Sequence, residues 1–163
     1  MKSLWLIRHA KSSWKFPNLG DNQRPLNKRG NRDALFMGKL LRKFGVQPDL
    51  ILASTAIRAY ETAGLIAKEL HHAGEKVVAD ERLYLADMND ILNIIRSTNA
   101  TVSKLIVVGH NPELTRLANA FTNFGIEKIP TCGIVGVDFN VQSWKEIEAG
   151  TLTMYEYPKK YLP

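Results

Sequence analysis

The strongest constraint on the fold is the alternation of short, uninterrupted apolar runs with longer amphipathic stretches. Three runs, at residues 4–7, 50–53 and 105–108, contain only apolar residues. Such runs, when this short, are typical of strands buried on both faces, as in a parallel sheet. The stretches between them have helical periodicity, so the sequence predicts an α/β fold with a mainly parallel sheet.

Apolar residues recur at helical spacing in the intervening stretches. The stripes are Ala34, Met37, Leu41 and Phe44; Ala56, Ala59, Ala63, Ile66 and Leu70; Leu114, Leu117, Phe121 and Phe124; and a weaker one at Met88, Ile91 and Ile95. Three polar residues are placed to cap these helices: Asn27 the first, Thr55 the second, and Asn111 the last, where Pro112 follows at the first helical position.

The end of the chain has a different pattern. Residues 134–139 and 151–157 are β-rich, and the connection between them is short enough for an antiparallel hairpin. No repeat, low-complexity stretch or flexible linker divides the chain, so we expect residues 1–163 to form a single domain. The expected architecture is three-layered, α/β/α, with a mainly parallel central sheet and a C-terminal antiparallel hairpin.

Composition narrows the choice of partners. A net charge of +6 favours an acidic binding partner, but the 22 Lys and Arg residues are scattered along the chain. With no recognition-helix stripe or aromatic RNA-binding signature, we expect no nucleic-acid partner.

Arg8 interrupts the first apolar run too early for a signal peptide or membrane span, and Cys132, the lone cysteine, cannot form an internal disulfide. We therefore expect a cytoplasmic protein without membrane association.

Polar residues follow each of the three apolar runs. Arg8 and His9 end the first, Ser54 precedes a helix that carries Arg58 in its first turn, and His110 ends the third. The carboxyl ends of parallel strands meet at one edge of a sheet, where ligands bind in open α/β folds. We therefore expect two histidines and two arginines to converge there.

Phosphoryl transfer is the chemistry that this set can carry. A neutral His9 imidazole can attack phosphorus, and the guanidinium groups of Arg8 and Arg58 can bind the phosphoryl oxygens in bidentate fashion. His110, if cationic, would add charge-assisted donation. Arg58 lies near a helix N-terminus, where a cation is disfavoured by the macrodipole, so we expect an anion close to it.

Competing chemistries fit the sequence poorly. No Walker loop is present, and Cys132 has Asp138 rather than an arginine six residues on, so we expect a small buried residue instead of a nucleophile. No ligand spacing for a metal is visible. His71 and His72, before Gly74, are expected to be structural, because histidine can cap the carbonyls at a helix end.

Four segments in order resemble the histidine phosphatase superfamily, the phosphoglycerate mutase-like group, and most closely its short SixA-like phosphohistidine phosphatase branch. They are LIRHAKSSW (6–14), RPLNKRG (24–30), STAIRAYETA (54–63) and VGHNP (108–112). The resemblance implies a phosphoglycerate mutase-like fold, no metal or organic cofactor, transient phosphorylation of His9, and a phosphate surrounded by Arg8, Arg58 and His110. It also suggests a substrate contact by Arg24, with Ser12 and Ser13 as weaker candidates, whereas Trp14 is expected to pack rather than to recognise substrate.

The general acid of this family is missing from its expected place. Leu85 stands where related sequences often carry glutamate, and Asn111 stands where the acid phosphatase branch carries aspartate. Asp87 and Asp21 are possible proton donors, although each is as readily a helix cap or loop residue. A positioned acid contributes roughly 10²- to 10⁴-fold when an alkoxide must leave, but a departing imidazole, with a pKa of about 6.5, needs less help.

The leading hypothesis from the sequence is a phosphatase that acts on phosphohistidine in a partner protein. The stretch between Arg58 and His110 has no insertion long enough for a lid, so we expect an open, shallow site. Two alternatives stay open: a phosphatase of small phosphomonoesters that uses Asp87 or Asp21 as acid, and a noncatalytic phosphate-binding regulatory module. The sequence leaves the oligomeric state undetermined and is compatible with a monomer.

Overall fold

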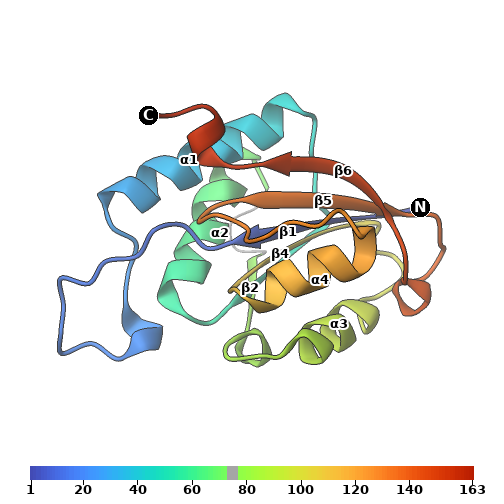
Figure 1. Cartoon of the computed structure of the whole chain (residues 1–163), viewed down its shortest axis with the longest axis horizontal. Coiled ribbons are helices and arrows are strands. Elements are labelled where there is room, and N and C mark those ends of the chain that lie inside the picture. The colour runs from blue at the N-terminus through green and yellow to red at the C-terminus, as the bar shows by residue number, and fades with distance from the viewer. Residues whose placement is uncertain (73–76) are drawn as a thin grey trace.

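The fold is built on one six-stranded sheet, seen in a computed structural model that describes residues 1–72 and 77–163 (Figure 1). The strands are β1 (Lys2–Arg8), β2 (Leu50–Ser54), β3 (Val77–Asp80), β4 (Lys104–Gly109), β5 (Ile134–Phe139) and β6 (Thr151–Glu156). Their order across the sheet is β3-β2-β4-β1-β5-β6. The first four are parallel, and β5 and β6 are antiparallel, which confirms the mainly parallel sheet and the C-terminal hairpin.

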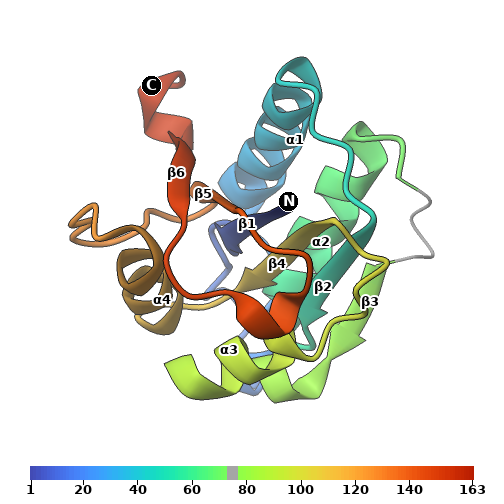
Figure 2. The same cartoon turned by 90° about the vertical axis from the view of Figure 1, so that its right-hand side faces the viewer.

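Helices cover both faces of this sheet, as Figure 2 shows. They are α1 (Lys28–Lys43), α2 (Ile57–Glu69), α3 (Met88–Arg96) and α4 (Glu113–Thr122). Along β1, Leu4 and Leu6 pack in the cluster with α3 and α4, whereas Trp5 and Ile7 pack with α1 and α2. This alternation follows from the two-residue period of a strand and confirms the three-layer α/β/α arrangement. Among the described residues, no helix combines the length and apolarity needed to cross a membrane.

The pairing of β1 with β4 sets the position of the two pocket histidines. Arg8 is in register with Gly109, so His9 and His110 are the next residues on adjacent strands. The His9 backbone N–H donates to the Gly109 carbonyl at 3.0 Å, which extends the ladder by one bond. Both side chains therefore leave the sheet at the same edge.

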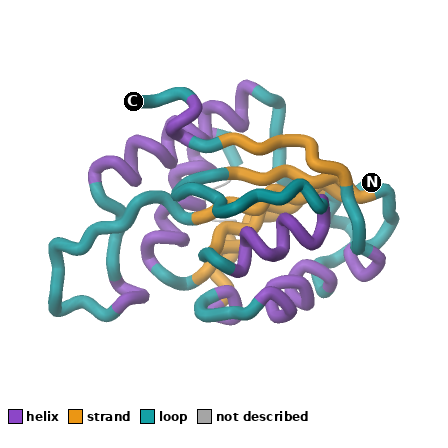
Figure 3. The backbone as a smooth tube through the Cα atoms, viewed as in Figure 1, coloured by secondary structure: helices purple, strands orange, loops and turns teal. Residues whose placement is uncertain are grey.

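A long loop connects β1 to α1 and extends beyond that edge (Figures 1 and 3). Its first part is tied back to the start of α1, because Asn27 N–H donates to the Lys11 carbonyl at 3.0 Å and Ser12 forms an isolated bridge with Leu26. Gly30 lies so close that a Cβ at this position would collide with the Lys11 carbonyl oxygen. The absence of a side chain at Gly30 is what allows α1 to support the loop.

One of the three predicted caps is present. Asn27 accepts a hydrogen bond from Gly30 N–H at 2.8 Å, as expected for an N-cap of α1. The prediction for Thr55 was wrong: the N-cap of α2 is Ala56, and its N–H donates to the Ser54 hydroxyl at 3.2 Å.

The prediction for Asn111 was also wrong. Helix α4 begins at Glu113, with Pro112 at the N-cap position. The Asn111 side chain makes tertiary contacts instead: its amide donates to the Ile129 carbonyl at 2.8 Å, and its oxygen accepts from the Thr115 hydroxyl at 2.8 Å. These bonds hold the loop before β5 against α4.

Further differences concern the ends of elements. Phe44 and Phe124 are 50% and 58% exposed, because both lie just past the helices whose apolar stripes they were expected to extend. His71 also lies past its helix; its backbone N–H donates to the Lys68 carbonyl at 3.2 Å, whereas its side-chain Nε2 contacts Arg42 Nη1 at 3.2 Å instead of a carbonyl. Gly74 lies outside the described residues.

Cys132 is fully buried, as predicted, and burial raises the pKa of its thiol.

Candidate active site

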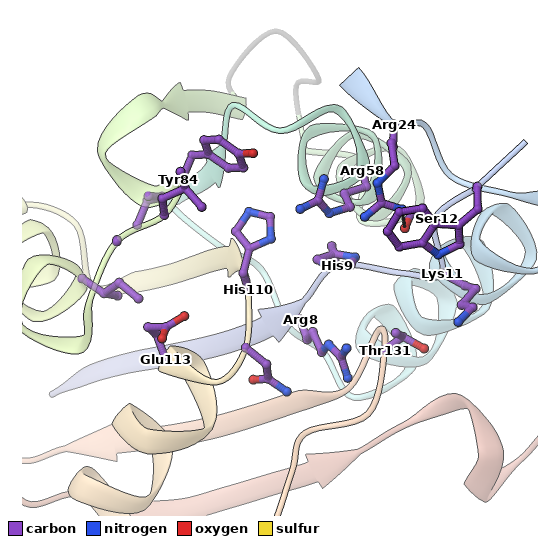
Figure 4. Close-up of a pocket in the computed structure, with 16 residues that line it drawn as sticks. Arg8, His9, Lys11, Ser12, Arg24, Arg58, Tyr84, His110, Glu113 and Thr131 are labelled. Carbon is purple, nitrogen blue, oxygen red and sulfur yellow. Dashed lines mark hydrogen bonds between the residues drawn. The ribbon is translucent and has the colours of Figure 1, made fainter. Parts of the chain in front are cut away.

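A pocket of about 300 Å³ opens at the carboxyl ends of the parallel strands (Figure 4). The structure brings all four residues of the predicted phosphate site into its wall: Arg8, His9, Arg58 and His110. They come from the ends of β1 and β4 and from the first turn of α2. In Figure 4, His9 lies between Arg8 and Arg58.

The protonation of His9 is fixed by its neighbour. Its Nδ1 lies 2.7 Å from the Ala10 carbonyl oxygen, which can only accept, so Nδ1 carries the hydrogen and Nε2 keeps its lone pair. Burial, and then the charges of His110, Arg58 and Arg8, lower the pKa of His9 to about 3, against the opposing effect of the Ala10 hydrogen bond. At neutral pH, His9 is therefore an uncharged imidazole with a free Nε2.

His110 is also uncharged in the ligand-free pocket. Its ring centroid lies 5.1 Å from that of His9, and its Nε2 lies 2.8 Å from the Ser54 hydroxyl oxygen. Burial first, and then the Arg58 charge, lower the pKa of His110 to about 4. The sequence analysis allowed for a cationic His110, but the lowered pKa makes the ring neutral at neutral pH. A nearby anion is expected to raise this pKa.

The two arginines are held by oxygens at the back and side of the pocket. Arg8 Nη1 donates to the Ile129 carbonyl at 3.0 Å. Arg58 donates through Nη1 to the Asp21 carbonyl at 2.6 Å and through Nη2 to the Asp21 carboxylate at 2.9 Å. Asp21 is thus the anion expected near Arg58. The Nε atoms of both arginines are buried without a partner among the described residues, which is costly unless a ligand accepts hydrogen bonds from them.

Asp21 is not placed as a proton donor. It accepts hydrogen bonds from the Tyr84 hydroxyl at 2.7 Å, from Arg58, and from Arg24 Nη2 at 3.2 Å. The Tyr84 hydrogen bond, followed by the two arginines, lowers the pKa of Asp21 to about 2, so it is a carboxylate at neutral pH. Asp87, the other proton donor considered, is exposed and caps α3 by accepting from Asp90 N–H at 2.8 Å. It is not among the residues that line the pocket.

Arg24 and Ser12 line the pocket, and Ser13 does not. Arg24 is buried, donates to the Ser12 hydroxyl at 2.7 Å, and lies under the Trp14 ring with 3.6 Å between its Cζ and the ring centroid. Trp14 is nevertheless 74% exposed. The expectation that Trp14 serves mainly for packing does not fit this exposure; its ring contacts the Arg24 guanidinium at the rim.

The pocket residues that the sequence did not indicate include Tyr84 and Glu113. Tyr84 lines the pocket beside His110, with 5.8 Å between the ring centroids. Glu113, the first residue of α4, is the one carboxylate among the described residues that line the pocket. Its position three residues after His110 was a usable signal, but an acid in the first turn of a helix is common for reasons of the dipole alone.

Within residues 1–72 and 77–163, no group of three or more His, Cys, Asp or Glu side chains is arranged to hold a metal ion.

Comparison with known proteins gives consistent results. Residues 4–100 match the profile of the histidine phosphatase superfamily (branch 1). An uncharacterised protein of Mycobacterium leprae is 32% identical over 94% of this chain and 100% of its own length. An Agrobacterium tumefaciens structure described as a candidate phosphohistidine phosphatase SixA is 26% identical, with a TM-score of 0.82 over 96% of this chain and 98% of that chain. The protein histidine phosphatase SixA in complex with tungstate has the same fold, with 19% identity and a TM-score of 0.83 over 97% of this chain and 98% of that chain.

Proposed function

Because the chain belongs to the histidine phosphatase superfamily and is therefore expected to be a phosphatase, we propose that it hydrolyses phosphohistidine on a partner protein by way of a phosphorylated His9. The observation that supports this most is the state of His9: an uncharged ring, with Nδ1 fixed by the Ala10 carbonyl and Nε2 free in a pocket that Arg8, Arg24 and Arg58 line.

The first step transfers the phosphoryl group to the protein. His9 Nε2 forms a bond to phosphorus while the bond between phosphorus and the substrate's imidazole nitrogen breaks. The departing ring carries a proton on its other nitrogen, so it keeps the electron pair of the broken bond and leaves as a neutral imidazole. Arg8 and Arg58 bind the phosphoryl oxygens, and His110, whose pKa rises beside the anion, donates a hydrogen bond to them.

The second step restores His9. Water attacks phosphorus, the bond to Nε2 breaks, and inorganic phosphate leaves with the proton of the water passing to solvent or to phosphate. In both steps the leaving group is an imidazole, which needs little acid assistance. This suits a pocket in which Asp21 is held as a carboxylate and Asp87 points elsewhere.

Glu113 favours one alternative, the hydrolysis of small phosphomonoesters. An alkoxide leaving group requires a proton donor, and this carboxyl group lines the pocket. The two functions differ in how strongly they depend on Glu113, and this difference can be measured.

The direct test is a comparison of substrates. The kcat/KM on a phosphohistidine peptide is measured against that on phosphoserine peptide and small phosphate esters, together with trapping of an acid-labile phosphoenzyme. We expect the highest value on phosphohistidine and no phosphoenzyme in His9→Ala. Equal or greater efficiency on esters would reject the protein substrate, and phosphate binding without turnover would indicate a regulatory module instead.

A further inference from the structure

A second cavity, here called the Trp14 groove, adjoins the pocket on the side of the long loop. It measures about 730 Å³ and is lined by residues 11–16 and 26–29. It shares Lys11, Ser12 and Trp14 with the pocket wall, so the two cavities adjoin. A chain that presents a phosphorylated side chain to His9 can therefore extend directly into the groove.

The walls of the Trp14 groove are apolar and exposed. Trp14 and Phe16 are 74% and 50% exposed, and Leu26 forms part of the lining. On the other rim of the pocket, Leu85 is 84% exposed and has a φ of +56°, a backbone conformation that costs a non-glycine residue free energy. Exposed apolar side chains on both sides of a polar pocket are typical of a surface that another protein covers.

The charge of the groove has one sign. Its lining contains Lys11, Lys15, Lys28 and Arg29 and no carboxylate. Of these cations, only Arg29 forms an ion pair with a described residue, at 3.4 Å from Asp33. Lys28 and Arg29 are also the first residues of α1, a helix end that has no acidic residue in its first turn. The amide donors and positive dipole of this end add to the attraction for an anionic group.

We propose that the Trp14 groove binds the segment of the partner protein next to its phosphohistidine, and that this segment carries apolar and acidic side chains. The proposal rests on the proposed function. An apolar side chain of the segment covers Trp14 and Phe16, and its carboxylates face Lys15 and Lys28. The groove thereby selects among phosphohistidine proteins, while the pocket recognises only the phosphoryl group.

The test compares three phosphohistidine probes: a peptide with leucine and glutamate flanks, the same peptide with glycine and serine flanks, and the free phosphorylated amino acid. We expect the wild type to prefer the first peptide. The variant K15E/F16S/K28E is expected to lower kcat/KM on that peptide by about tenfold and to leave hydrolysis of the free amino acid unchanged, because it removes apolar contact and charge outside the pocket.

A matched control is available on the far end of α1. Phe44 is as exposed as Phe16, at 50%, and K39E/K43E/F44S makes the same change of charge. We expect it to have no effect on any probe. A peptide with lysine flanks should be hydrolysed better by K15E/F16S/K28E than by the wild type.

Several outcomes would contradict the proposed role of the Trp14 groove and leave the proposed function unaffected. These are equal use of all three probes by the wild type, equal loss in the control variant, or loss that extends to the free amino acid. If K15E/F16S/K28E instead abolishes sedimentation with phosphatidylserine vesicles and spares peptide hydrolysis, the surface binds membrane. Fluorescence anisotropy of the unphosphorylated glutamate peptide tests the groove even if no phosphohistidine is hydrolysed. Binding to the wild type that is lost in K15E/F16S/K28E supports the groove proposal. No binding to the wild type rejects it.

Discussion

Acid should destabilise the phosphate-free protein through its two pocket histidines. The pKa of His9 is lowered to about 3 and that of His110 to about 4, whereas both have a pKa of about 6.5 in the unfolded chain. Below about pH 6.5 the unfolded state therefore binds more protons than the folded state, and stability falls as the pH decreases toward 4. At about pH 5 the loss is at most about 2 kcal/mol for each histidine, because each pKa unit corresponds to about 1.4 kcal/mol.

This loss is large against the 5–15 kcal/mol that is typical of a domain, so urea unfolding followed by tryptophan fluorescence can measure it. The wild type, His9→Gln and His110→Gln are compared at about pH 7 and about pH 5. Each variant should recover up to about 2 kcal/mol of the acid-induced loss, because glutamine takes up no proton. His71→Gln, at an exposed position outside the pocket, is the control and should behave like the wild type.

Phosphate or tungstate should reverse the effect, since an anion between the histidines raises both pKa values. The reasoning is refuted if His9 titrates by NMR with a pKa near 6.5 in the ligand-free protein, or if both glutamine variants lose as much stability in acid as the wild type.

Three further changes have clear expected results. Arg8→Lys should lower kcat/KM on a phosphohistidine peptide by roughly 10²-fold while the unfolding midpoint stays nearly constant, because lysine keeps the charge but loses the planar fork; an unchanged rate would remove Arg8 from the phosphate site. Glu113→Gln should slow hydrolysis of phosphate esters by roughly 10²-fold and phosphohistidine hydrolysis by much less, and equal effects in steady-state assays would contradict the leaving-group argument. Gly30→Ala should cost about 3 kcal/mol in urea unfolding, because the new Cβ meets the Lys11 carbonyl, and a near-native value would mean that the loop moves freely.

The sheet and the positions of the phosphate-site residues followed from local pattern. Runs such as residues 4–7 are read correctly because a strand buried on both faces has no polar position, and the end of the run is marked by the first charged residue, Arg8. Edge strand β3 (Val77–Asp80) was not singled out, since two of its four residues are exposed and its pattern resembles a loop. The convergence of His9 with His110 needed only the general rule for parallel strand ends.

Contacts between segments that are distant in the sequence could not be predicted from local sequence pattern. Asp21 looked like a loop residue because its partner, Arg58, is 37 positions away, and no periodicity connects them. Thr55 was a good cap by residue type, but α2 begins one residue later, after Ala56, whose N–H donates to Ser54, and Ser54 also contacts His110. The contacts of Ser54 with His110 and of Asn111 with Ile129 are tertiary hydrogen bonds that residue type alone does not predict, and the capping predictions failed at these two of the three sites.

The β1–β4 register has a consequence for how this protein can be redesigned. His9 and His110 directly follow adjacent strands that backbone hydrogen bonds hold in register, so their spacing is independent of the side chains on the rim. Trp14 and Leu85 belong to connecting segments on either side of the pocket. Grafting those segments from other proteins of this fold should therefore transfer substrate preference, while His9 and His110 keep their positions.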